Sequence, residues 1–119
     1  MIRKVAGSNP AGRAMKKLYI VIRSDLRPGL IAAQACHALQ AMNDQHPEVI
    51  AGWEGNIALL GAKNRAALAD LLGALQRRYP VASFCEPDEG GDLTAIAVHG
   101  DAWRALSSLP LALKERAVE

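Results

Sequence analysis

The chain has 119 residues, half of them apolar and few of them aromatic, which predicts one domain with a core of aliphatic side chains. Five of its fourteen basic residues lie within residues 1–17, which contain no acidic residue, so residues 18–119 carry a net charge of −3. This balance excludes a generally basic RNA-coating domain and restricts any contact with nucleic acid to a local surface. We expect residues 1–16 to form a basic, flexible leader and residues 17–119 to form the domain.

The two cysteines, Cys36 and Cys85, lie in apolar surroundings without the spacing of a zinc site. They indicate reduced thiols, which are typical of a cytoplasmic protein. No apolar stretch approaches the roughly 20 residues of a membrane span, and no signal-peptide core is found near the start. We therefore expect no metal and no membrane association.

The first expected element is a strand over residues 17–23, whose apolar, β-branched composition is typical of a strand covered on both faces. The turn Arg27-Pro28-Gly29 leads into a helix that ends before Pro47, where a short second helix over residues 47–53 begins. A second strand is predicted over residues 56–61. An amphipathic helix capped by Asn64 follows over residues 64–78.

The rest of the chain predicts two strands, over residues 81–85 and 93–99, separated by an acidic turn over residues 86–92. That turn is short enough for an antiparallel hairpin, and a final helix over residues 102–109 is expected with Asp101 as its cap. Helical crossovers make the first three strands parallel and place helices on both sheet faces. The predicted fold is α/β: a three-layer α/β/α domain with a mixed four-stranded sheet in the order β-α-α-β-α-β-β-α.

One apolar arc of the first helix is predicted to face the core, and it contains Ile31, Ala35, Ala38, Leu39 and Met42. The adjoining flank carries Gln34, His37 and Ala41. Because Ala41 is small, it leaves room for another group to approach the helix there. This flank is the expected place for chemistry.

The loops after the first and third strands should meet at one edge of the sheet, where ligands bind in open α/β folds. A histidine such as His37 beside a carboxylate of the acidic turn is a competent base for activating water. Gln34 could orient that water or donate to an oxyanion, and the first N–H groups of the helix favour an anion. The alternatives are structural: His37 as a solvated residue, the acidic turn as a solvated loop, and Asp25 as an acceptor of backbone N–H groups.

Two motifs in this region resemble the type 2 peptidyl-tRNA hydrolase family. Arg23-Ser24-Asp25-Leu26 is similar to the R-x-D-L strand end of that family, and residues 29–38, GLIAAQACHA, are similar to its G-K-x-A-A-Q-x-x-H-A helix. The resemblance is closest to the divergent peptidyl-tRNA hydrolase domain-containing branch, which also reads A-Q-A-C-H-A. It extends over residues 17–113, because the predicted order of elements is also that of the family.

The resemblance implies hydrolysis of the ester between a peptide and the 3′ end of tRNA, which recycles the tRNA. It implies peptidyl-tRNA as the partner, no cofactor, and a homodimer, since small domains of this type are often dimeric. Gln34 and His37 correspond to the helix motif and Asp25 to the strand end. The family's D-A-G-x-T-Q loop corresponds by residue type to Glu86 through Thr94.

The candidate residues fall into two groups. The catalytic candidates are His37, Gln34, Glu86 and Asp88. The substrate-binding candidates are Arg23, Asp25, Arg27, Gly29 and Thr94.

The sequence departs from the family motif at its lysine, because that position is Leu30 here. Arg27 is the candidate substitute for the missing cation. The departure keeps two alternatives open. One is a weak or inactive family member that acts as an RNA- or protein-binding domain, and the other is hydrolysis of a different ester or amide.

Overall fold

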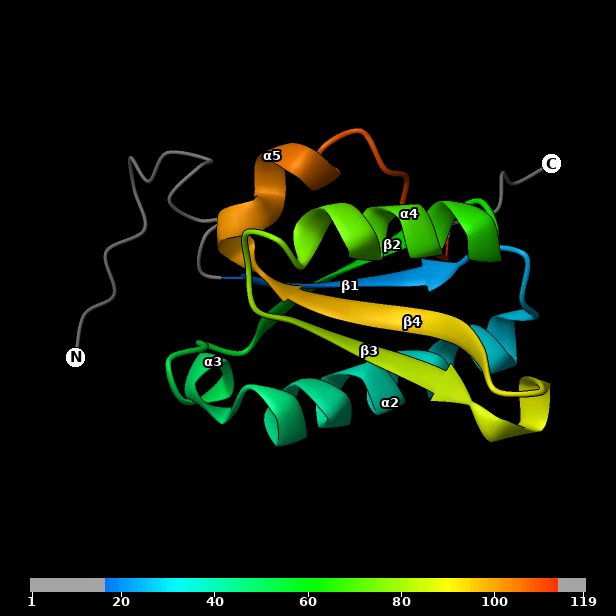
Figure 1. Cartoon of the computed structure of the whole chain (residues 1–119), viewed down its shortest axis with the longest axis horizontal. Helices are drawn as coiled ribbons and strands as arrows, with labels where there is room; N and C mark the ends of the chain where they lie inside the picture. The colour runs from blue at the N-terminus through cyan, green and yellow to red at the C-terminus, as the bar shows by residue number, and fades with distance from the viewer. Residues whose placement is uncertain (1–16, 114–119) are drawn as a thin grey trace, which may run out of the picture.

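A four-stranded mixed sheet divides the protein into two helical layers in the computed structural model, which describes residues 17–113 (Figure 1). The strands are β1 (Lys17–Arg23), β2 (Asn56–Ala62), β3 (Val81–Glu86) and β4 (Asp92–His99), in the spatial order β2-β1-β4-β3. β1 is parallel to β2, and β4 is antiparallel to both β1 and β3. The first three strands therefore point the same way, as predicted.

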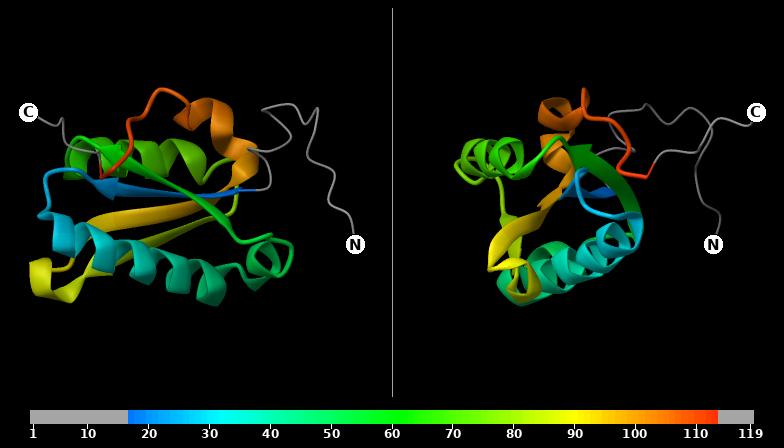
Figure 2. Two further views of the ribbon diagram at one scale, coloured as in Figure 1. Left: turned by 180° about the vertical axis from the view of Figure 1, so that it is seen from behind. Right: turned by 90° about the vertical axis from the view of Figure 1, so that its right-hand side faces the viewer.

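Helices cover both faces of this sheet (Figures 1 and 2). α2 (Pro28–Gln45) and α3 (Pro47–Ala51) lie on one face, and α4 (Arg65–Leu75) and α5 (Trp103–Leu106) lie on the other. Two short 3₁₀ segments, η1 (Pro87–Glu89) and η2 (Gly100–Ala102), precede β4 and α5. The predicted α/β architecture and the order of its elements are confirmed; the proposed leader over residues 1–16 lies outside the described residues.

The burial of β1 explains why its sequence is almost continuously apolar. Leu18, Ile20 and Ile22 belong to the core beneath α2, whereas Tyr19 and Val21 belong to the core beneath α4. Successive strand side chains point to opposite faces, so a strand covered on both sides needs apolar residues at both parities.

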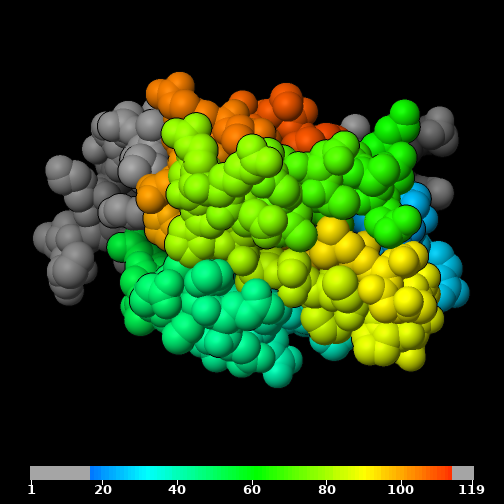
Figure 3. Space-filling model, in the orientation of Figure 1, coloured from blue at the N-terminus to red at the C-terminus, as the bar shows by residue number. Residues whose placement is uncertain are grey.

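The hairpin between β3 and β4 is irregular at the end where the candidate site lies. The register shifts between Phe84 and Cys85, and η1 lies between the strands. Gly90 and Gly91 then turn the chain with φ angles of 71° and 79°, a conformation natural to glycine. In the space-filling view this hairpin (yellow) forms one corner of the molecule (Figure 3).

The buried face of α2 differs from the predicted arc, and this is a correction. Gln34 and Ala41 are buried, while Ala35 and Leu39 are only half-buried. The helix packs mainly against β3 and β4, so its core face is rotated toward Gln34. Ala41 therefore packs against the sheet and provides no room for an approaching group.

Two helix caps were predicted, of which Asn64 is confirmed and Asp101 is wrong. Asn64 Oδ1 accepts the Ala67 N–H at 2.9 Å and caps α4 as predicted. Asp101 does not cap the final helix; His99 Nδ1 accepts the Asp101 N–H at 3.0 Å and caps η2 instead. His99, the last residue of β4, therefore caps the turn that follows the strand. The final helix, α5 (Trp103–Leu106), is shorter than the predicted range of residues 102–109.

Candidate active site

A buried polar network joins α2 to the β3–β4 hairpin. Gln34 is fully buried, and its Nε2 donates a hydrogen bond of 2.6 Å to Glu86 Oε1. Thr94, also fully buried, donates from Oγ1 to Gln34 Oε1 at 2.5 Å. Both ends of the Gln34 amide are thus satisfied, which fixes the orientation of the side chain.

Glu86 is the carboxylate at the outer end of this network, and only 8 % of the residue is exposed. Its second oxygen accepts the Asp88 N–H at 3.2 Å. The hydrogen bond from Gln34 is the main cause that lowers the pKa of Glu86 below 4.5, followed by the Asp88 N–H and the nearby His37. Glu86 is therefore an anion at neutral pH.

His37 lies one helical turn after Gln34 and faces both solvent and the network. Its Nε2 lies 3.9 Å from Glu86 Oε1, and 43 % of its side chain is exposed. The imidazole stacks on the Phe84 ring, with centroids 4.5 Å apart and planes inclined by 14°. The ring is consequently supported on one side by Phe84 while it stays open to a substrate.

This arrangement has the parts of a general base. The Glu86 carboxylate beside Nε2 favours the His37 tautomer with hydrogen on that atom. Nδ1 then remains to accept a proton. The separation of 3.9 Å is longer than a hydrogen bond, so in the absence of substrate the coupling is electrostatic.

Arg23 and Asp25, two predicted substrate-binding residues, form a pair at the end of β1. Arg23 donates from Nε and from Nη2 to the two Asp25 carboxylate oxygens, each at 3.0 Å. This hydrogen bonding raises the pKa of Arg23 and lowers that of Asp25. Asp92 lies 3.9 Å from Arg23 Nη1 and 4.0 Å from Arg65 Nε, so Arg23 is surrounded by carboxylates. The structure places it as a loop-ordering residue.

Arg27 and Gly29 line a surface hollow at the start of α2, together with Leu30 and Ala33; its volume is about 450 Å³. Ala33 and His37 are four residues apart on one helix and therefore share a face. The hollow thus borders the helix face that carries His37, although His37 does not line it. Of the substrate-binding candidates, Arg27 and Gly29 are the two that line it.

Asp88 of the acidic turn and Thr94 of β4 do not lie where a catalytic and a substrate-binding residue were expected. Asp88 is exposed, and within residues 17–113 Glu86 is the carboxylate that lies within 4 Å of His37. Thr94 is sealed in the core, and its hydroxyl, which donates to Gln34, also lies 3.4 Å from Phe84 O. Neither Thr94 nor Gln34 is exposed, so neither side chain is placed to contact a bound molecule.

Phe84 is the contributor that the sequence reasoning missed. It is the chain's one phenylalanine and lies two residues after Ala82, which packs beneath α2. The two-residue period of a strand therefore placed its ring on the α2 side, where the helix histidine could stack on it. That signal was present in the sequence.

A second hollow of about 450 Å³ lies between α2 and α3, lined by Cys36, Leu39, Gln40, Asn43, Ile50 and Trp53. Its lining is mainly apolar and it does not include His37. No cluster of three or more potential metal ligands occurs among residues 17–113. None of the helices in this range has both the length and the hydrophobicity to span a membrane.

Fold and geometry together define an α/β domain with an exposed histidine beside a hydrogen-bonded, ionised glutamate. Comparison with models of known protein families gives no match, and comparison with curated proteins gives none either.

Proposed function

We propose that this protein is an ester hydrolase of the peptidyl-tRNA hydrolase type. The observation that carries the proposal is the placement of solvent-exposed His37 at 3.9 Å from Glu86, which Gln34 holds ionised and oriented. The motif resemblance at residues 23–26 and 29–38 supports the choice of substrate.

In the proposed reaction, His37 Nδ1 removes a proton from water as the water oxygen attacks the ester carbonyl carbon. The tetrahedral intermediate collapses by cleavage of its bond to the ribose oxygen, which takes the proton back from His37. The products are tRNA with a free terminal hydroxyl and a peptide carboxylic acid, which releases its proton to solvent and becomes a carboxylate. Glu86 stabilises the transient imidazolium, and such general-base catalysis contributes about 10²- to 10⁴-fold in rate.

Gln34 and Thr94 act indirectly in this scheme. The sequence suggested that Gln34 touches the water or the carbonyl, but its burial assigns it to orienting Glu86. Arg27 and the N-terminal turn of α2, beside the hollow that Gly29 lines, would attract the terminal phosphate of the substrate.

The test is release of tRNA from an N-acetylated aminoacyl-tRNA by the wild-type protein and by the Glu86→Gln variant. Glutamine keeps the acceptor oxygen for Gln34 but cannot stabilise an imidazolium. We expect turnover by the wild type and a loss of about 10-fold or more in the variant. Equal turnover by both proteins would remove the proposed role of Glu86.

A second candidate function is a non-catalytic RNA- or protein-binding domain. The observation that favours it is that the network of Thr94, Gln34 and Glu86 also serves as a structural clamp between α2 and the hairpin. Leu30, at the position of the motif lysine, leaves the hollow with fewer cations. Binding of tRNA without any turnover would select this function.

A further inference from the structure

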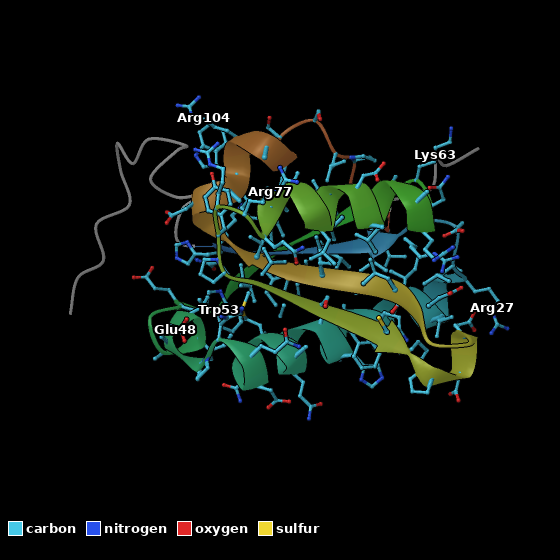
Figure 4. All side chains as sticks on the ribbon, in the orientation of Figure 1. Arg27, Glu48, Trp53, Lys63, Arg77 and Arg104 are labelled. Carbon is cyan, nitrogen blue, oxygen red and sulfur yellow. The ribbon has the colours of Figure 1, made fainter. Side chains whose placement is uncertain are left out.

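Three arginines lie together at the end of the molecule opposite the hairpin. Arg77 and Arg78 follow α4, and Arg104 belongs to α5. Figures 1 and 2 show α5 beside the C-terminal end of α4, and Figure 4 shows Arg77 and Arg104 at this end and Arg27 at the other. We call Arg77, Arg78 and Arg104 the arginine surface.

Two of these side chains are supported by aromatic rings. The Arg104 guanidinium carbon lies 4.7 Å from the centre of the Trp103 ring, and that of Arg78 lies 5.8 Å from the Tyr79 ring. Trp103 and Tyr79 pack against the same core cluster. The stacking limits the motion of both cations and leaves their N–H donors directed to solvent.

The arginine surface forms no ion pair with a carboxylate of residues 17–113. Within residues 17–113, no carboxylate lies within 4 Å of its three guanidinium groups, in contrast to Arg23 and Arg65. Asp101 is close in sequence to Arg104 but lies 3.4 Å from His99 Nδ1.

Charges of both signs occur at both ends of the sheet: Arg23 and Arg65 lie beside Asp92 at the hairpin end, and Asp101 lies beside His99 at the other. Acidic residues gather at the hairpin end: Glu86, Asp88, Glu89 and Asp92. Lys17 begins β1 at the arginine end, since its neighbour Leu18 pairs with His99, which leads into η2 and α5. The exposed guanidinium groups of the arginine surface therefore offer a polyanion a local cationic contact.

We propose that the arginine surface binds the phosphate backbone of RNA, and that in the proposed reaction it holds the body of the tRNA while the 3′ end reaches His37. Rigid, planar guanidinium groups make two parallel hydrogen bonds to a phosphate, which suits three neighbouring arginines to a nucleic-acid backbone. This inference rests on the proposed function for the identity of the RNA.

The length of the sheet gives this inference a kinetic consequence. β3 runs from Val81 to Glu86 and spans roughly 17 Å at about 3.3 Å per residue. Because the arginine surface and α2 lie on opposite faces of the sheet, the path between the two sites is longer than this strand. A tRNA can span that distance, whereas an ester on a short oligonucleotide cannot. The arginine surface therefore affects the KM of the long substrate alone.

The test compares Arg77→Glu and Arg104→Glu with Lys63→Glu, an equal charge change at an exposed lysine near the far end of the sheet. Fluorescence anisotropy with uncharged tRNA measures Kd at several salt concentrations. We expect each arginine variant to raise Kd roughly tenfold and to reduce the salt slope by about one, with little effect of Lys63→Glu. Arg77→Lys, which keeps the charge but loses the planar pair of donors, should weaken binding less than Arg77→Glu does.

Unchanged Kd values in the arginine variants would overturn the inference, as would equal weakening by Lys63→Glu. Binding of an acidic polypeptide, and not of tRNA, by the arginine surface would also overturn the inference. Circular dichroism of each variant verifies that the fold is intact.

Kinetics separate this inference from the proposed function. With N-acetylated aminoacyl-tRNA, the arginine variants should raise KM and leave kcat unchanged, and hydrolysis of the same ester on a short 3′-end oligonucleotide should not change. If the wild-type protein binds tRNA through Arg77 and Arg104 but hydrolyses neither substrate, the proposed hydrolase is refuted and RNA binding by the arginine surface is supported. If both substrates are hydrolysed and the arginine variants have no effect, the RNA-binding role of the arginine surface is refuted and the proposed hydrolase is not.

Discussion

Gln34 on α2 donates a 2.6 Å hydrogen bond to Glu86, which lies 52 residues later at the end of β3. This bond joins the leading helix to the hairpin inside the core. It also sets the carboxylate beside His37, so one contact serves both the packing of the fold and the geometry of the candidate site.

Replacing Gln34 by alanine should lower the free energy of unfolding by about 2–4 kcal/mol, because Thr94 and Glu86 lose their partner and a cavity forms. Thr94→Val keeps the shape and should cost about 1–2 kcal/mol. Urea unfolding measures both effects.

The double variant Gln34→Ala/Thr94→Val provides the control for that network. If Gln34 and Thr94 act through each other, their combined cost should fall short of the sum of the single costs by about 0.5–2 kcal/mol. Strictly additive costs would show that the two residues stabilise the fold independently.

The stability of the protein should depend on pH through Glu86. Its pKa in the folded protein lies below 4.5, chiefly because of the Gln34 hydrogen bond, so ionised Glu86 stabilises the fold above about pH 4.5. This contribution is lost as the pH falls through the folded-state pKa. The Glu86→Gln variant should therefore lose less stability than the wild type as the pH falls from neutral to below 4.5.

Unfolding by urea at each pH measures that difference. Asp25 also has a lowered pKa, but it is present in both proteins and cancels in the comparison. Parallel curves for the two proteins would mean that Glu86 is not stabilised as an anion in the fold.

Phe84→Leu should separate the support of the His37 ring from the burial of an apolar side chain. Leucine fills much of the volume but removes the stacking seen at 4.5 Å. We expect kcat to fall about two- to tenfold, since aromatic pairs contribute about 0.5–1.5 kcal/mol. Thermal unfolding of the variant shows how much of the change comes from packing. A kcat equal to that of the wild type would exclude a role for the stacked ring.

Leu30→Lys restores a cation at the position of the family lysine, beside the hollow lined by Arg27. Because an exposed ionic contact contributes about 0.5–1 kcal/mol, the KM for N-acetylated aminoacyl-tRNA should fall about two- to fivefold. Leu30→Gln is the uncharged control. A similar fall in KM with glutamine would mean that polarity rather than charge is responsible.

The sequence predicted the fold well because its local signals agree with the tertiary structure. The apolar run of residues 17–23 is β1 over the same residues, and Asn64 caps α4 as its side chain suggests. Both are determined by neighbouring residues. The short acidic turn likewise predicted the antiparallel pairing of β3 and β4.

The site was predictable only in part, because its geometry depends on how α2 is rotated against the sheet. Periodicity alone counted Gln34 as a flank residue, but packing against β3 and β4 turned it into the core. Arg23 was expected to bind the substrate, yet its guanidinium is paired with Asp25 two residues away. Neither outcome follows from residue spacing without the positions of the neighbouring strands.

The most direct test of the hydrolase is release of tRNA from N-acetylated aminoacyl-tRNA by His37→Ala, measured beside the wild type and Gln40→Ala, an exposed substitution on the same helix. We predict that the wild type and Gln40→Ala turn over at similar rates and that His37→Ala loses about 100-fold or more in kcat. Undiminished kcat in His37→Ala, or no release by the wild type, would contradict the proposal.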